Sequence, residues 1–123
     1  MLNIFLGVNI MGLIKETGEQ VQNCIDMCTD CEQACIECMK MCLEEEDVKE
    51  RKGCINMLME CSIICKTAAT FMIMESQHSK ELCTLCEKIC RQCAKECDMF
   101  KEEHCKICSE TCEECAEECK AMA

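Results

Sequence analysis

Apolar positions recur along this chain at alternating steps of three and four residues, and most of them are occupied by cysteine. Between residues 24 and 42 the cysteines follow one another at steps of four, three, four, three and four. Such spacing places side chains on one face of a helix that packs against other helices. Leu, Ile and Val normally fill such a face because they bury apolar area. The pattern therefore predicts a core-facing helix with a column of thiols on its inner face.

The same periodicity recurs in three further segments. Four such faces, joined by short connections and without a strand signal, predict an all-α antiparallel four-helix bundle with a cysteine-lined core. We expect helices over about 17–43 and 48–75, a third between turns at 76–79 and 98–102, and a fourth after the second of these turns. The predicted metal-facing thiols are Cys24, Cys28, Cys31, Cys35, Cys38, Cys42, Cys54, Cys61, Cys65, Cys83, Cys86, Cys90, Cys93, Cys97, Cys105, Cys108, Cys112, Cys115 and Cys119.

Two capping-box patterns predict where the first two helices begin. Thr17 is followed three residues later by Gln20, and Asp47 in the same way by Glu50. In such a box the first side chain accepts a hydrogen bond from the backbone, and the second reaches back to the cap residue. We therefore expect both helices to carry side-chain caps.

The chain divides into an apolar N-terminal extension, residues 1–16, and a four-helix-bundle domain, residues 17–123. The segment 1–14 is apolar, and residues 1–13 are expected to add a short helix. No Lys or Arg precedes this segment, no small-residue cleavage site follows it, and it is too short to span a bilayer. We interpret it as a retained segment of a cytoplasmic protein.

The excess of acidic residues restricts which molecules the protein is expected to bind. The chain carries 24 acidic and 13 basic residues, for a formal net charge of -11. That excess disfavours binding to nucleic acid and to anionic membranes. Cations or neutral proteins are the expected partners.

The second helix is expected to be apolar nearly all round, unlike the third and fourth, whose outer faces are charged. A helix that is apolar on every side is buried on every side. A lone bundle cannot bury this face, so we predict a homo-oligomer with two-fold symmetry formed through the second helix. The outward apolar residues are Ile55, Met59, Ile63, Ile64, Phe71 and Ile73.

Nineteen cysteines in 123 residues indicate either disulfides or metal. Cysteines three or four apart on a helix have Cβ atoms about 5–6 Å apart, farther than the ~3.8 Å of a disulfide. A packing role alone would leave the core underfilled, because the side chain is small. One ion with bonds of about 2.3 Å joins sulfurs ~4–4.6 Å apart, which this spacing provides. The pattern therefore favours soft metal ions.

Charge favours one of these ions. Zinc held by four thiolates leaves about -2 in each site, which is costly when such sites are stacked in an apolar bundle. A monovalent ion shared by bridging thiolates gives a neutral core, and Cu(I) is the monovalent ion that thiolates select. We expect about one Cu(I) per cysteine, on the order of 15–20 per chain. A zinc or cadmium sequestration protein stays open as an alternative, as does a thiol redox protein that forms inter-helical disulfides.

A family resemblance points the same way. The motif CxxCxxxCxxCxxxC begins at Cys83 and again at Cys105, and the tripeptide EHC covers 103–105. With the first thiol column, these features resemble the bacterial copper storage proteins, especially the cytosolic branch, over roughly residues 17–121. The resemblance implies a four-helix bundle that stores Cu(I) on core thiolates and assembles as a tetramer. The twin-arginine signal of exported members is not present in this sequence.

An up-down-up-down path predicts two different ends of the bundle. One, called the thiol end, gathers Cys42, Cys54, Cys97 and Cys105, and we expect copper to enter there. The opposite end is predicted to be closed by an apolar plug made of Val21, Ala68, Met72, Leu82 and Met122.

Other soft or borderline ligands lie near the thiol end. His104 is a candidate entry ligand, because it precedes Cys105 and belongs to the EHC tripeptide. Four methionines are interpreted first as packing side chains and second as copper ligands: Met39, Met41, Met57 and Met99. His78 is expected at the opposite end and is interpreted as inert.

No nucleophile with a neighbouring base is recognisable, so no enzymatic activity is predicted. The sequence predicts a cytoplasmic Cu(I) store whose partners are copper ions, further copies of the chain, and molecules that donate or accept copper.

Overall fold

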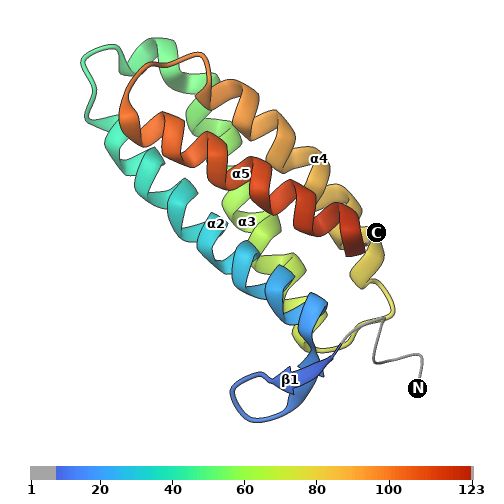
Figure 1. Cartoon of the computed structure of the whole chain (residues 1–123). Helices are drawn as coiled ribbons and strands as arrows, with labels where there is room; N and C mark the ends of the chain where they lie inside the picture. Colours follow the sequence, from blue (N-terminus) through green and yellow to red (C-terminus); the bar gives the residue numbers. More distant parts are fainter. Residues whose placement is uncertain (1–7, 123) are drawn as a thin grey trace.

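The computed structural model describes residues 8–122 and shows four long helices packed into a bundle, with a small hairpin at one end (Figure 1). The elements are β1 (Asn9–Met11), β2 (Glu16–Gly18), α2 (Glu19–Leu43), the short 3-10 helix η1 (Val48–Arg51), α3 (Lys52–Ile73), α4 (Ser79–Cys97) and α5 (Glu103–Met122). Helix α2 packs against α3 and α5, and α4 packs against the same two helices. The predicted antiparallel four-helix bundle is confirmed.

The core of the bundle consists mainly of sulfur. All nineteen cysteines are at most 2% exposed, so every predicted thiol position faces inward. Few larger side chains share the interior, and Leu58 is the main one that is completely buried. Cysteine thus occupies the core positions that larger apolar side chains normally fill.

Neither predicted capping box forms. Helix α2 begins at Glu19 with Gly18 as its cap residue and no side-chain cap, because Thr17 belongs to β2. Asp47 precedes η1, also without a side-chain cap, and its carboxylate accepts a hydrogen bond from Arg51 Nε at 2.6 Å instead. Thr17 is instead paired within the hairpin, and Asp47 is paired with Arg51, so neither side chain caps a helix.

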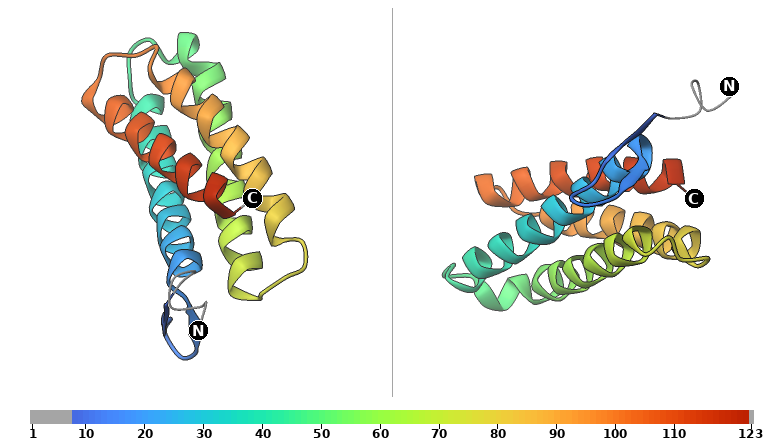
Figure 2. Two further views of the ribbon diagram at one scale, coloured as in Figure 1. Left: turned by 45° about the vertical axis from the view of Figure 1, so that its right-hand side comes forward. Right: turned by 90° about the horizontal axis from the view of Figure 1, so that it is seen from below.

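The predicted N-terminal helix is wrong for the described part of the segment. Residues 9–18 form an antiparallel hairpin in which Ile10 pairs with Thr17. Its turn is closed by the backbone N–H of Gly12, which donates to the Lys15 carbonyl at 2.7 Å. The prediction for residues 1–7 lies outside the described residues. Figure 2 shows the hairpin extending beyond the helices at the end where α2 begins, here called the hairpin end.

Helix α3 presents apolar side chains to solvent as well as to the core. Met59, Ile63 and Ile73 are 49–60% exposed, whereas Ile64 is buried within the bundle. Within the described residues, the segment from η1 through α3 is also the one long and apolar enough to cross a membrane, by length and composition only, and nearly half of its most apolar stretch is buried in the bundle. Self-association through this face stays a prediction.

Candidate metal centre

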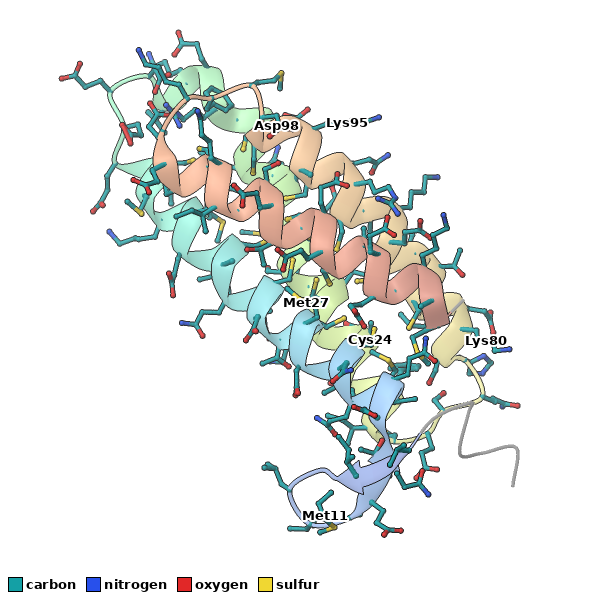
Figure 3. All side chains as sticks on the ribbon, in the orientation of Figure 1. Met11, Cys24, Met27, Lys80, Lys95 and Asp98 are labelled. Carbon is teal, nitrogen blue, oxygen red and sulfur yellow. The ribbon has the colours of Figure 1, made fainter. Side chains whose placement is uncertain are left out.

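Thiols of different helices meet along the axis of the bundle. Figure 3 shows sulfur atoms between the helices and charged groups pointing outward. The Sγ atom of Cys61 lies 3.6 Å from that of Cys90, and other cross-helix pairs lie up to 4.0 Å apart. Two bonds of about 2.3 Å that meet at a trigonal or tetrahedral ion hold their sulfurs about 3.8–4.0 Å apart. The thiols therefore stand at the separation that a bridging ion needs.

One layer contains a cysteine from each of the four helices. Cys31, Cys65, Cys90 and Cys115 have Sγ atoms that all lie within 4.8 Å of one another. This is the arrangement that the zinc alternative requires, and the sequence predicted that such a layer could exist.

Neighbouring clusters share their sulfurs. Cys31 also belongs to a second group of four, and Cys115 belongs to a third. Cys119 joins that third group to a further cluster of three thiols. Because one sulfur belongs to two clusters, these four clusters form a connected network of thiols. The four clusters are Cys31/Cys65/Cys90/Cys115, Cys31/Cys35/Cys61/Cys112, Cys28/Cys86/Cys115/Cys119 and Cys24/Cys83/Cys119.

The thiols are free and hydrogen-bonded to one another. No cysteine forms a disulfide within the described residues, which include all nineteen. Burial, with the neighbouring Cys42, raises the pKa of Cys105 to about 12. A metal ion binds the thiolate, so an ion that occupies this position must displace a proton.

His104 joins the outermost cluster, at the thiol end. Its Nδ1 atom lies 3.3 Å from Cys38 Sγ and 3.6 Å from Cys105 Sγ, and Nε2 lies 3.3 Å from a carboxylate oxygen of Glu45. The ligand atoms of Cys38, Cys42, His104 and Cys105 all lie within 4.8 Å of one another and form this cluster. The imidazole is 11% exposed, whereas the thiols beside it are at most 2% exposed. His104 is therefore the member of this cluster that extends toward the solvent.

Arg51 closes the thiol end, a position that was not predicted from the sequence. Its side chain is almost completely buried, at 1% exposed, and one guanidinium nitrogen lies 3.7 Å from both Cys42 Sγ and Cys105 Sγ. This guanidinium covers Cys42, so the end is not open at this cysteine, whereas copper entry at the thiol end stays a prediction. A signal was present: residue 51 lies three positions before Cys54 and therefore continues the inward-facing column of α3.

Acidic and aromatic neighbours hold the Arg51 guanidinium in place. It pairs with Asp47 at 2.6 Å and with Glu102 at 2.8 Å, and it lies 4.4 Å from the ring centre of Phe100. The hydrogen bond from Arg51 is the main cause that lowers the pKa of both carboxyl groups. These contacts connect the loop before α3 to the loop before α5.

Replacing Arg51 with methionine is expected to expose the outer thiols. Methionine retains much of the length but removes the ion pairs that join the two loops, and local opening should become easier. We expect alkylation of Cys42 and Cys105 in the metal-free protein to accelerate by roughly tenfold, which corresponds to about 1.4 kcal/mol of opening free energy. Mass spectrometry of peptides after timed iodoacetamide labelling measures this rate. Unchanged labelling of both thiols would show that Arg51 does not cover them in solution.

The remaining candidate ligands are distributed as follows. Met39 and Met57 are half-buried against the core, whereas Met41 and Met99 are 46% and 65% exposed. His78 is exposed at the hairpin end, where its ring bonds to a carboxylate of α4. His78 belongs to none of the clusters described above.

The predicted apolar plug is partly wrong. Ala68 and Met72 are buried as expected, but Val21, Met72 and Met122 line a cavity of about 450 Å³ instead of filling the end of the bundle. The hairpin forms another wall of this cavity through Thr17 and neighbouring residues. The cavity was not predicted from the sequence because it depends on the hairpin, where a helix was expected.

A helical bundle with an interior of shared thiol clusters defines a class of protein built to hold several soft metal ions. The family model for copper storage proteins matches residues 17–123, and the chain belongs to this family. This agrees with the resemblance noted from the sequence.

Individual relatives agree with the family match. The Cu(I)-bound copper storage protein BsCsp3 has 40% identity and a TM-score of 0.80, over 85% of this chain and 99% of that chain. The copper storage protein Ccsp from Streptomyces lividans, loaded with 10 copper equivalents, has 29% identity and a TM-score of 0.82, over 85% and 83%. The cysteine-rich protein YhjQ of Bacillus subtilis is 42% identical over 81 residues, 66% of this chain and 75% of that protein.

Proposed function

We propose that this protein is a cytoplasmic Cu(I) store that holds about one ion per cysteine on the thiolates of its core. The observation that carries the proposal is the sharing of sulfurs between successive clusters along the bundle. The copper-bound relatives support the identity of the ion. A related copper storage protein from Streptomyces lividans is described as cytosolic, which supports the compartment. The proposed ligands are the nineteen cysteines and His104, and no catalytic step is required of them.

Charge supports Cu(I) over zinc. Among the described residues, Arg51 is the one cationic side chain that is buried. Nineteen thiolates would therefore lack counter-charge unless the ions supply it. One Cu(I) per thiolate gives a neutral interior, whereas zinc in four-thiolate sites leaves an excess of negative charge that an apolar bundle disfavours.

Loading should release protons. The pKa of Cys105 is raised to about 12, so this thiol is protonated in the empty protein at neutral pH. Cu(I) displaces that proton, and the apparent affinity therefore falls as the pH is lowered. We expect Cu(I) binding to this thiol to release a proton at pH 7, measured anaerobically in weak buffer with a pH indicator. Binding without proton release would contradict thiolate coordination.

We further propose that His104 transfers copper between the solvent and the outermost thiols. It is the least buried member of its cluster, at 11% exposed, and its ring lies 3.3 Å from Cys38 Sγ. Replacing His104 with alanine is expected to slow the first phase of Cu(I) uptake by about tenfold, equivalent to about 1.4 kcal/mol in the barrier, with nearly unchanged capacity. Stopped-flow transfer from a coloured Cu(I) chelator measures this phase.

The matched control is His78→Ala. His78 is exposed at the opposite end and contacts no thiol. This variant should take up Cu(I) at the wild-type rate. Equal rates in all three proteins would show that His104 has no part in transfer.

We also propose that the chain self-associates through the exposed apolar face of α3. Met59, Ile63 and Ile73 are about half exposed on α3, and charged residues dominate the outer faces of α4 and α5. Burial of this face between copies would remove apolar surface from water. A tetramer is the assembly that the family resemblance implies.

A further inference from the structure

The hairpin end also carries the thioether sulfur of Met72. Met72 lies on the inward-facing column of α3, two positions along that column from Cys65. Its thioether accepts a hydrogen bond from the Cys83 thiol, with Sδ and Sγ 3.7 Å apart. This separation matches the distances between thiols in the core. A metal ion that binds Cys83 is therefore within reach of Met72.

Cys83 itself belongs to the last thiol cluster before the hairpin end. Its Sγ atom lies within 4.8 Å of those of Cys24 and Cys119, and the latter two are 3.9 Å apart. All three thiols are completely buried. They come from α2, α4 and α5, whereas α3 contributes no cysteine to this cluster. Met72 is the residue of α3 that occupies this place.

The cavity at this end reaches Met72 from the other side. Met72 is 4% exposed and lines the space of about 450 Å³ together with Met122. Glu16 and Glu75 also line it. Lys15 pairs with Glu75 at 2.5 Å. Glu16 is the other carboxylate in the cavity lining, and this ion pair does not neutralise its charge. Carboxylates at this cavity favour a cation.

We propose that Met72 is a Cu(I) ligand that completes the Cys24/Cys83/Cys119 cluster, and that the cavity at the hairpin end gives Cu(I) access to it. The proposal rests on the proposed storage of Cu(I). It assigns a ligand and a route at the end that the sequence predicted to be closed. Because a thioether is uncharged and soft, it adds a bond to Cu(I) without adding negative charge, and it offers little to zinc.

The test replaces Met72 with leucine, which keeps the side-chain volume and removes the sulfur. The matched control is Met74→Leu, because Met74 is two residues away, 71% exposed and outside the cavity lining. Crystals of the reduced, Cu(I)-loaded proteins are measured at the copper edge. In the wild-type protein and the control, we expect an anomalous peak about 2.3 Å from the Met72 sulfur. In Met72→Leu, the ion should have only thiolate ligands.

A solution measurement accompanies the crystals. Anaerobic transfer of Cu(I) to a strong chelator should release about one ion per chain roughly tenfold faster from Met72→Leu than from either other protein, since one bond is lost. Copper in the central clusters but none bonded to Met72, together with equal release rates, would overturn the proposal and leave storage intact. Absence of copper from every thiol cluster would instead overturn the storage function.

Discussion

Replacing Cys31, Cys65, Cys90 and Cys115 together with serine is expected to lower the Cu(I) capacity of the reduced protein by about four ions per chain. These residues form the layer with one thiol from each helix. Serine has nearly the size of cysteine, but its hydroxyl neither ionises at neutral pH nor attracts a soft ion. If each thiolate bridges ions in a neutral network, capacity falls in proportion to the sulfur removed. Anaerobic titration against a competing chelator measures the loss.

A smaller variant is the control for this proportionality. Cys54 and Cys97, whose sulfurs lie 3.9 Å apart at the thiol end, are replaced with serine as a pair. The expected loss is about two ions. Loss of a single ion when the four-thiol layer is removed would indicate an isolated tetrahedral site, as the zinc alternative requires. Circular dichroism of each metal-free variant verifies that the helices are retained.

Full Cu(I) loading is expected to raise the thermal unfolding midpoint by more than about 20 °C. A ligand at 100 times its dissociation constant stabilises the folded state by about 2.7 kcal/mol per site. Several such sites together approach the whole stability of a typical domain, about 5–15 kcal/mol. For a domain of this size, each additional kcal/mol in the free energy of unfolding raises the thermal unfolding midpoint by about 4 °C. The ions also fill a core that cysteine alone packs poorly.

Calorimetry of the metal-free and loaded proteins under reducing, anaerobic conditions measures this shift. Removal of copper with a chelator should restore the lower midpoint, which excludes damage by oxidation as the cause. An increase below about 5 °C would mean that the ions are not bound in the core that holds the helices together.

The thiol core was predictable from the sequence because its cause is periodic. Steps of three and four place Cys31 and Cys35 on one helix face, and short connections make the helices antiparallel. The shared clusters follow once four such faces meet. Which sulfurs share an ion, however, depends on the rotation of each helix, and a spacing pattern does not specify it.

Arg51 shows why the thiol end was harder to predict. A charged residue near a helix start is normally solvated, and its burial here depends on Asp47, Glu102 and Phe100. These partners come from two loops that are distant in sequence. The position of Arg51 in the column of α3 was a signal, but its charge argued against a core position.

The hairpin end was mispredicted for a different reason. Thr17 and Gln20 fit a capping box, yet Thr17 pairs with Ile10 across a turn. Pairing between strands is a contact between separate segments, and the apolar run before it fits a helix and a strand equally well. The cavity beside Met72 follows from this hairpin and was missed with it.

Anaerobic titration of the fully reduced protein with Cu(I), in competition with a chelator of known affinity, tests the central claim most directly. A neutral network of bridging thiolates predicts saturation on the order of 15–20 Cu(I) per chain, close to the nineteen cysteines. Saturation near four ions, or the absence of tight binding, would contradict a Cu(I) store of this kind.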